Sequence, residues 1–194
     1  MNNRRKSSKN NSAMGSIRLI AGMHRGRKLP VLMAEGLRPT TDRVKETVFN
    51  WLMPYIQDSH CLDCFAGAGS LGFEAYSRGA QQVTMIELNK DAANQLKLNS
   101  KTLATENVIV HNTDTIKFLA GNTQKFDLVF IDPPFRQGLV EKVIALMGQE
   151  WLANNALVYV ETEAEHQLKY LPENWHLHKE KVAGQVAYRL YQVK

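Results

Sequence analysis

From Cys61 onward the chain alternates short β-type runs with helical segments, and this alternation constrains the fold more than any other feature. The predicted strands are Cys61–Phe65, Gln82–Ile86, Asn107–His111, Phe126–Ile131 and Ala156–Glu161. The predicted helices between them are Ser70–Arg78, Lys90–Ala104, Thr115–Ala120 and Leu139–Met147. Strands separated in this way by helices form a parallel, doubly wound α/β sheet.

The segment ahead of the alternation follows a different pattern. Two β-type runs, Ser16–Ala21 and Lys28–Leu32, are joined by a glycine-containing turn and predict a hairpin. A helix is then predicted from Asp42 to Ile56, because its apolar residues recur at helical spacing. Thr41 precedes this helix as its expected N-cap.

The C-terminal end also departs from the alternation. His176–Val182 and Val186–Gln192 are β-type runs separated only by a short turn that contains Gly184. Such a hairpin gives the predicted sheet an antiparallel edge.

The net charge of +5 is distributed unevenly. The first acidic residue is Glu35, and the chain before it carries only basic charges: Arg4, Arg5, Lys6, Lys9, Arg18, Arg25, Arg27 and Lys28. The rest of the chain is net acidic. Residues 1–12 read as a disordered, solvated tail. Arg25, Arg27 and Lys28 lie instead within a patterned segment, which favours a polyanionic partner such as RNA or DNA.

Composition excludes several classes of protein. Hydrophobic residues make up 44% of the chain and charged residues 22%, which is enough apolar material for a folded core. No uninterrupted apolar run is long enough for a membrane span, and no apolar segment follows the basic N-terminus as in a secretory signal. We therefore expect a cytoplasmic protein with no membrane association.

Two cysteines, Cys61 and Cys64, are spaced as in redox and zinc motifs. A strand places residues three apart on opposite faces of the sheet, and no second cysteine pair exists to complete a zinc site. We therefore interpret both as buried strand residues and expect no metal site.

A glycine-rich loop follows the first strand of the alternation. Gly67, Gly69 and Gly72 stand in the pattern G-x-G-x-x-G before a predicted helix, and such a loop allows a ligand to approach the backbone. Glu87 ends the next strand and can accept hydrogen bonds from both hydroxyls of a ribose. Asp63 precedes the glycines, where its charge repels a pyrophosphate and attracts a sulfonium or ammonium group. The loop therefore favours S-adenosylmethionine over a nicotinamide cofactor.

Asp114 follows the third strand. Two roles fit this position: an acceptor for the adenine amino group of the cofactor, or an N-cap for the following helix.

A second loop, Asp132-Pro133-Pro134-Phe135, follows the fourth strand. The prolines stiffen the chain and leave carbonyl acceptors without donors. Hydrogen bonds from an exocyclic amine to Asp132 and to the Pro133 carbonyl would favour a pyramidal nitrogen with a free lone pair. Phe135 offers a face on which a base can stack. The first and fourth strands can be neighbours at the topological switch point, which would bring both loops to one crevice.

These two loops resemble those of the class I, S-adenosylmethionine-dependent amino methyltransferases. Three flanking segments narrow the resemblance: 25–30 (RGRKLP), 38–46 (RPTTDRVKE) and 180–189 (EKVAGQVAYR). With these segments the chain resembles the RsmD family, bacterial guanine-N2 methyltransferases of 16S ribosomal RNA. The resemblance runs from Ile17 to Val193.

The resemblance implies a Rossmann-like, mostly parallel seven-stranded sheet with an antiparallel C-terminal hairpin and a small N-terminal β-hairpin extension. The corresponding division is a disordered basic tail (1–14), the hairpin extension (15–40) and a methyltransferase domain (41–194). It implies S-adenosylmethionine as cofactor, S-adenosylhomocysteine as product, and a guanine of 16S rRNA within the small subunit or its assembly intermediate as target. We expect a monomer.

The expected site residues fall into three groups. The acceptor site comprises Asp132, Pro133, Pro134 and Phe135. The cofactor site comprises Asp63, Phe65, Gly67, Gly69, Glu87, Leu88 and Asp114. RNA contacts are expected from Arg25, Arg27, Lys28, Arg38 and Arg43, although Arg43 can instead pair with Glu46.

Three alternatives remain open at this point. A methyltransferase acting on another amino group, such as adenine N6 in DNA or RNA, would use the same Asp132 loop. A nicotinamide-dependent oxidoreductase would use the glycine loop with Glu87, but Asp63 argues against it. A non-catalytic RNA-binding module would account for the basic hairpin and leave the two loops without a role.

Overall fold

The structure is a computed structural model that describes residues 14–32, 42–121, 124–148 and 150–194. Most of the predicted basic tail, together with Arg38 and Thr41, lies outside these residues. Met14, assigned above to the tail, is instead the first residue of a strand. No helix among the described residues is long and apolar enough to cross a membrane.

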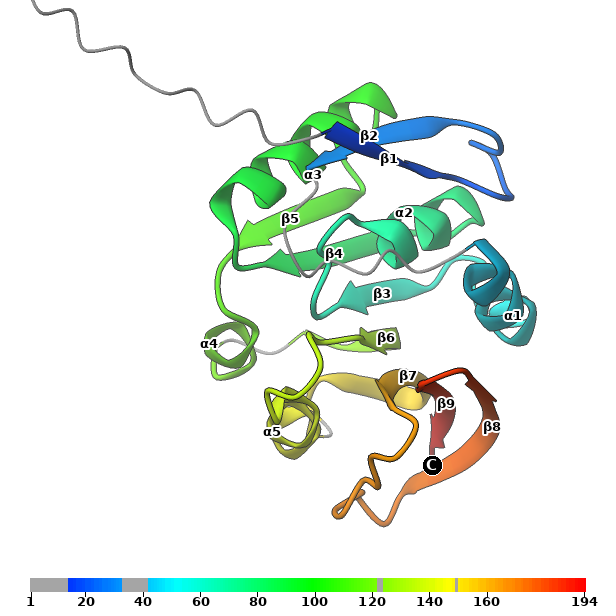
Figure 1. The fold of residues 1–194 in the computed structure, drawn as a ribbon, viewed down its shortest axis with the longest axis vertical. Coiled ribbons are helices and arrows are strands. Elements are labelled where there is room, and N and C mark those ends of the chain that lie inside the picture. Colours follow the sequence, from blue (N-terminus) through cyan, green and yellow to red (C-terminus); the bar gives the residue numbers. More distant parts are fainter. Residues whose placement is uncertain (1–13, 33–41, 122–123, 149) are drawn as a thin grey trace, which may run out of the picture.

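The strands form two sheets (Figure 1). The small sheet contains β1 (Met14–Arg18) and β2 (Lys28–Leu32), which are antiparallel. The large sheet has the order β5-β4-β3-β6-β7-β9-β8. Its strands are β3 (His60–Asp63), β4 (Gln82–Glu87), β5 (Val108–Asn112), β6 (Phe126–Ile131), β7 (Leu152–Glu163), β8 (Trp175–Ala183) and β9 (Val186–Val193). Strands β3 to β7 are parallel, and β9 is antiparallel to both β7 and β8. The predicted doubly wound sheet with an antiparallel C-terminal hairpin is confirmed.

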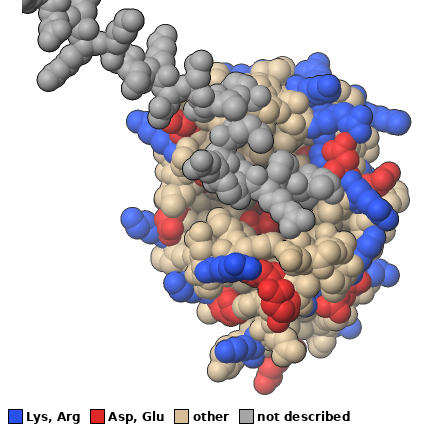
Figure 2. Space-filling view, in the orientation of Figure 1, with Lys and Arg blue, Asp and Glu red and all other residues tan. Residues whose placement is uncertain are grey.

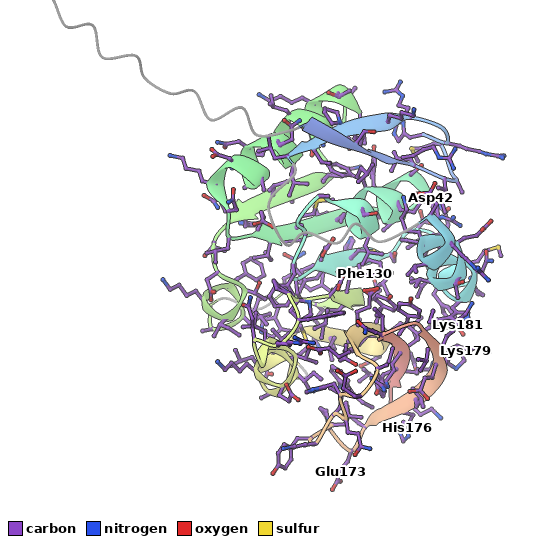
Figure 3. The ribbon with its side chains drawn as sticks, viewed as in Figure 1. Asp42, Phe130, Glu173, His176, Lys179 and Lys181 are labelled. Carbon is purple, nitrogen blue, oxygen red and sulfur yellow. The ribbon has the colours of Figure 1, made fainter. Side chains whose placement is uncertain are left out.

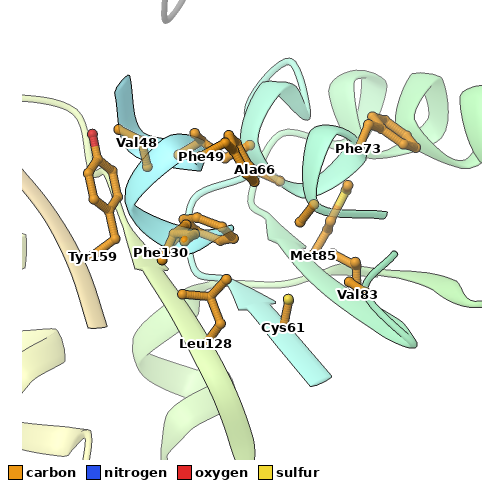
Figure 4. Packing of buried hydrophobic residues seen from close by; sticks show 14 of the residues in the cluster. Val48, Phe49, Cys61, Ala66, Phe73, Val83, Met85, Leu128, Phe130 and Tyr159 are labelled. Atoms are coloured by element: carbon orange, nitrogen blue, oxygen red, sulfur yellow. The ribbon is translucent and has the colours of Figure 1, made fainter. Parts of the chain in front are cut away.

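Five helices cover the two faces of the large sheet in the described residues. They are α1 (Asp42–Leu52), α2 (Ser70–Ser77), α3 (Lys90–Thr102), α4 (Thr115–Leu119) and α5 (Leu139–Leu146). Helices α1, α2 and α3 share one buried apolar cluster with the small sheet, and α4 and α5 share a second cluster on the opposite face. Figure 4 shows the first cluster, in which Phe49 of α1 packs near Phe130 of β6. Cys61 belongs to the first cluster and Cys64 to the second, so the predicted opposite orientation of the two cysteines is confirmed.

Several element ends differ from the predicted ones. Helix α1 ends at Leu52 rather than Ile56, because Pro54 disfavours helical backbone in the residue before it. Strand β1 ends at Arg18 rather than Ala21, because the following residues turn to dock on α2. Strand β3 ends at Asp63, where the glycine loop begins.

The small sheet is fastened to α2 and α1 by buried polar groups. The carboxylate of Glu74, which is 0% exposed, accepts hydrogen bonds from the backbone N–H groups of Ile20 and Ala21. Ser77 Oγ donates to the Ala21 carbonyl, and the buried Lys45 Nζ donates to the Arg18 carbonyl. A Cβ on Gly22 would lie 1.7 Å from the Ser77 carbonyl oxygen, so only glycine permits this close approach. The hairpin therefore sits in a fixed place on the domain.

Candidate active site at the switch point

The glycine loop and the Asp132 loop leave neighbouring strands. Strand β3 pairs with β4 on one side and with β6 on the other, so the strand order reverses at β3. Ligands of doubly wound sheets bind at the carboxyl ends of strands where this reversal occurs. The predicted adjacency of the two loops is confirmed, and the candidate site lies at the carboxyl edge of β3 and β6.

Backbone geometry shapes the glycine loop for close approach of a ligand. Gly67 and Gly69 have φ values of 50° and 79°, in the left-handed region. Gly69, the N-cap residue of α2, makes no side-chain cap, and within the first turn the Asp63 carboxyl group accepts from the Gly72 N–H. A helix N-terminus of this kind attracts negative charge and hydrogen-bond acceptors.

Glu87 ties the glycine loop to the end of β4. One carboxylate oxygen accepts from the Gly67 N–H at 2.8 Å, and the other accepts from the Asn89 N–H at 2.6 Å. Each carboxylate oxygen has a second lone pair, so the ribose hydroxyls of a cofactor can still donate to this group. Leu88 follows Glu87 with its side chain 69% exposed, and an exposed leucine beside a ribose acceptor can pack against an adenine ring.

Asp63 lies under the loop as a buried carboxyl group. It accepts hydrogen bonds from the N–H groups of Gly72 and Phe65, at 3.2 Å and 3.4 Å. Burial and the negative charge of Glu87 raise the pKa of Asp63 to about 7, although the two backbone hydrogen bonds act in the opposite direction. Phe65 is partly buried against the α4–α5 face. Asp63 thus holds the loop in shape, a role that sequence reasoning missed.

Asp114 caps α4. Its side chain accepts a hydrogen bond from the Lys117 N–H at 3.1 Å, so the N-cap interpretation is confirmed. The second interpretation, an acceptor for the adenine amino group, stays a prediction.

The Asp132 loop is held in place by side-chain packing and by a hydrogen bond to β7. Pro133 is buried and Pro134 is exposed, while Asp132 and Phe135 are partly buried. Phe135 packs against the apolar cluster on the α1–α3 face. The Arg136 N–H donates to Glu163 Oε1 at 2.7 Å, which fastens the end of the loop to β7.

A second carboxyl group, Glu161 of β7, lies beside Asp132. The two side chains are hydrogen-bonded, and Tyr159 donates its hydroxyl to Glu161 Oε1 at 3.1 Å. Burial and the neighbouring charge of Glu161 raise the pKa of Asp132 well above its usual range. Sequence reasoning missed Glu161, because it ends the mostly apolar predicted strand Ala156–Glu161 and its closeness to Asp132 depends on the register of β6 and β7.

The predicted RNA-binding residues of the hairpin do not lie at this site. Arg25, Arg27 and Lys28 are exposed in and after the β1–β2 turn. The backbone N–H groups of Met23 and His24 donate to Ser77 at the end of α2, and Arg27 donates to the carbonyl of Thr102, the last residue of α3. Because α2 and α3 both start at the carboxyl edge, their ends lie about 12 and 20 Å along the helices from it. Figure 2 shows Lys and Arg gathered at the upper right, the side to which this turn extends in Figure 1.

Arg43 lies in the first turn of α1 and is exposed. No ion pair joins it to Glu46 in the described structure, so the alternative of a pairing with Glu46 is not observed. One turn on, Thr47 accepts a hydrogen bond from Lys181 of β8 (Figure 3). Lys181 lies opposite Tyr188 of β9, which lies opposite Glu161, so this cation is level with the carboxyl edge. Sequence reasoning also missed Lys181.

Comparisons with known proteins place the chain in a family. It matches the family described as Conserved hypothetical protein 95 over residues 17–192. The ribosomal RNA small subunit methyltransferase D of Escherichia coli K12 is 55% identical over 94% of this chain and 93% of its own. The protein of the same name from Haemophilus influenzae is 58% identical over 93% of this chain and 96% of its own. The chain is a member of the RsmD family.

A solved structure of an Escherichia coli putative methyltransferase agrees with this membership. It is 55% identical, has a TM-score of 0.85 and covers 93% of this chain and 99% of its own. The resemblance read from the motifs is therefore confirmed across nearly the whole length of this RsmD-family chain.

The loop residues of this RsmD-family chain fit an S-adenosylmethionine molecule. Ser70 Oγ, in the first turn of α2, is buried and has no hydrogen-bond partner in the described structure. Glu87 provides carboxylate acceptors beside Gly67, and Asp63 provides a carboxyl group beneath the loop. Unused acceptors and an orphaned hydroxyl in the first turn of a helix match the hydroxyl, ammonium and carboxylate groups of this cofactor. Among the described residues, no group of three or more His, Cys, Asp or Glu side chains is arranged to hold a metal ion.

Proposed function

We propose that this chain transfers a methyl group from S-adenosylmethionine to the exocyclic N2 of a guanine in 16S rRNA. Family membership makes it an S-adenosylmethionine-dependent methyltransferase of small-subunit ribosomal RNA. The observation that carries the proposal is the adjacency of the glycine loop and the Asp132 loop at the β3–β6 switch point. The choice of guanine N2 rests on the resemblance of the flanking segments.

The cofactor would be held by the glycine-loop side of the crevice. Gly67 and Gly69 allow close approach of the backbone, Glu87 accepts from the ribose hydroxyls, and Leu88 packs against the adenine. Asp114 accepts from the adenine amino group, while Asp63 and Phe65 line the loop from below. S-adenosylmethionine supplies the methyl group and leaves as S-adenosylhomocysteine.

The acceptor base would be held by the Asp132 loop. Asp132 and the Pro133 carbonyl accept the two hydrogens of the amine, which directs the nitrogen lone pair away from the base plane. Phe135 stacks on the base, and Pro134 keeps the loop rigid. As the new N–C bond forms, N2 acquires positive charge and loses one proton, which Asp132 is placed to accept.

The RNA would be held at a distance from the reacting base. We assign phosphate contacts to Arg25, Arg27, Lys28, Arg38 and Arg43, because phosphate contacts position a nucleic acid without reading its sequence. In this proposal residues 1–13 form a basic tail, 14–40 an RNA-contacting extension and 41–194 the catalytic domain. The enzyme acts in the cytoplasm as a monomer, on the small subunit or its assembly intermediate.

Methyl transfer from isotope-labelled S-adenosylmethionine tests the proposal. The acceptors are small ribosomal subunits that lack the modification, with naked 16S rRNA and duplex DNA in parallel, and mass spectrometry identifies the labelled nucleoside. We expect labelled N2-methylguanosine from the subunits. Label in adenosine or in DNA would show that the target is another base and not a guanine of 16S rRNA. Cofactor binding without label in any nucleic acid would contradict the proposal.

A further inference from the structure

Acidic side chains of three neighbouring strands form a row at the carboxyl edge. Side chains alternate along a strand, so Asp63, Asp132 and Glu161 face the same side as Cys61, Phe130 and Tyr159, which lie two residues before them in the α1–α3 cluster. Cross-strand register pairs Ile131 with Val160, so Asp132 lies level with Glu161, and it pairs Asp63 with Phe130, two residues before Asp132. We call Asp63, Asp132 and Glu161 the acid row.

Contacts within the acid row join Asp132 to Glu161 in particular. A hydrogen bond between two carboxyl groups needs one proton shared between them. A hydrogen-bond donor of a ligand can take the place of this proton. Tyr159, which is 0% exposed, donates its hydroxyl to Glu161 and fixes its orientation. The charge of Asp63 also acts on Asp132, and Tyr188 of β9 lies opposite Glu161. No part of the proposed reaction above uses Glu161.

The edges of the bases differ in what they offer two adjacent acceptors. Guanine presents the N1–H donor directly beside its N2 amino group. Adenine presents the N1 acceptor beside its N6 amino group, and cytosine presents the N3 acceptor beside its N4 amino group. A second carboxylate next to Asp132 would gain a hydrogen bond from guanine and would face a lone pair on adenine or cytosine.

We propose that Glu161 accepts the N1–H of the target guanine while Asp132 accepts an N2–H, so that Glu161 selects guanine as the methylated base. This inference rests on the proposed function. In it, the two donors of the guanine edge replace the proton that Asp132 and Glu161 share in the absence of RNA, and this proton is released to solvent. Tyr159 is a positioning residue that donates its hydroxyl to Glu161 Oε1.

A single-position base replacement tests this selection. Mass spectrometry first locates the guanine that the wild-type enzyme labels. Small subunits are then reconstituted with guanine or with 2-aminopurine at that position, because 2-aminopurine keeps the N2 amine but carries an N1 acceptor in place of N1–H. The wild-type enzyme should prefer guanine by about 10- to 100-fold in kcat/KM.

The variant Glu161→Gln should change this preference. A glutamine amide can donate to the N1 acceptor of 2-aminopurine, so methylation of 2-aminopurine should rise while that of guanine falls. The matched control is Glu165→Gln, the same chemical change at an exposed glutamate that follows β7. It should leave the ratio of the two rates as in the wild type. Calorimetric binding of S-adenosylmethionine and thermal unfolding show whether each variant retains its fold and cofactor site.

Two outcomes would overturn the inference while leaving the proposed function intact. One is a wild-type enzyme that forms N2-methylguanosine but methylates both bases equally. The other is a Glu161→Gln variant in which both rates fall by the same factor, which would restrict Glu161 to positioning Asp132. A wild-type enzyme that forms no N2-methylguanosine on any subunit would instead contradict the proposed function, and this inference with it.

Discussion

The carboxyl edge of the large sheet and the β1–β2 turn differ in charge and in task. The carboxyl edge carries the acid row together with Glu87 and Asp114, whereas the turn presents Arg25, Arg27 and Lys28 at the far ends of α2 and α3. An acidic crevice repels phosphates and attracts a cationic cofactor and the amine of a base. In the proposed function, the carboxyl edge performs the chemistry and the β1–β2 turn holds the RNA.

The two regions are held at a fixed separation by buried contacts. Glu74 and Ser77 of α2 bind the turn backbone, and the same helix begins at the glycine loop. An RNA that touches both regions must therefore span about 12 to 20 Å, the lengths of α2 and α3. A folded RNA or a subunit can present such a surface, which fits the proposed substrate better than a short single strand.

The largest expected effect comes from removing the acceptor carboxyl group. Asp132→Ala should lower kcat for methyl transfer by about 10²- to 10⁴-fold, because the amine loses the group that orients it and accepts its proton. Cofactor affinity, measured by calorimetry, should change little, since the glycine loop is intact. Full activity in this variant would remove Asp132 from the chemistry.

The next effect comes from the opposite region. Reversing the charges of Arg25, Arg27 and Lys28 together should raise the KM for subunits by roughly 10- to 100-fold and leave kcat nearly unchanged, because phosphate contacts position the substrate. Steady-state kinetics at several salt concentrations measure this change. The salt dependence of KM should become weaker as well.

Lys169, an exposed cation outside the turn, provides the matched control. Its charge reversal should leave KM for subunits as in the wild type. An unchanged KM in the triple variant would mean that the cations of the turn are only a solvated surface. The charge contrast between the two regions would then carry no function.

The smallest effect concerns pH. Asp63 has a pKa raised to about 7, so it is largely protonated at pH 6 and largely ionised at pH 8. A cationic cofactor binds the ionised form better, so affinity for S-adenosylmethionine should be lost as the pH falls through 7, by about tenfold between pH 8 and pH 6. Isothermal titration calorimetry at these pH values measures the change.

Two comparisons sharpen this result. S-adenosylhomocysteine lacks the sulfonium charge, so it should show a smaller pH dependence if Asp63 acts on that charge and an equal one if Asp63 acts on the ammonium group. In Asp63→Asn the pH dependence should disappear. A dependence that persists in Asp63→Asn would assign the titration to another group.

Local patterns in the sequence were sufficient to predict the elements and the two loops. Strand–helix alternation places every loop that follows a strand at the carboxyl edge, because all strands of a parallel sheet run in one direction. Gly67, Gly69, Glu87 and Asp132 could therefore be placed from their spacing alone. The charge asymmetry of the chain likewise predicted a basic hairpin.

Tertiary structure decided what spacing does not encode. Glu161 meets Asp132 only through the register of two strands that are distant in sequence, and a one-residue shift would turn it to the other face. The basic turn lies far from the glycine loop and the Asp132 loop because Gly22, Glu74 and Ser77 dock it at the end of α2. The sequence alone thus determined which chemical groups each loop carries, since backbone and side-chain preferences are local. Long-range packing determined which of these groups lie together.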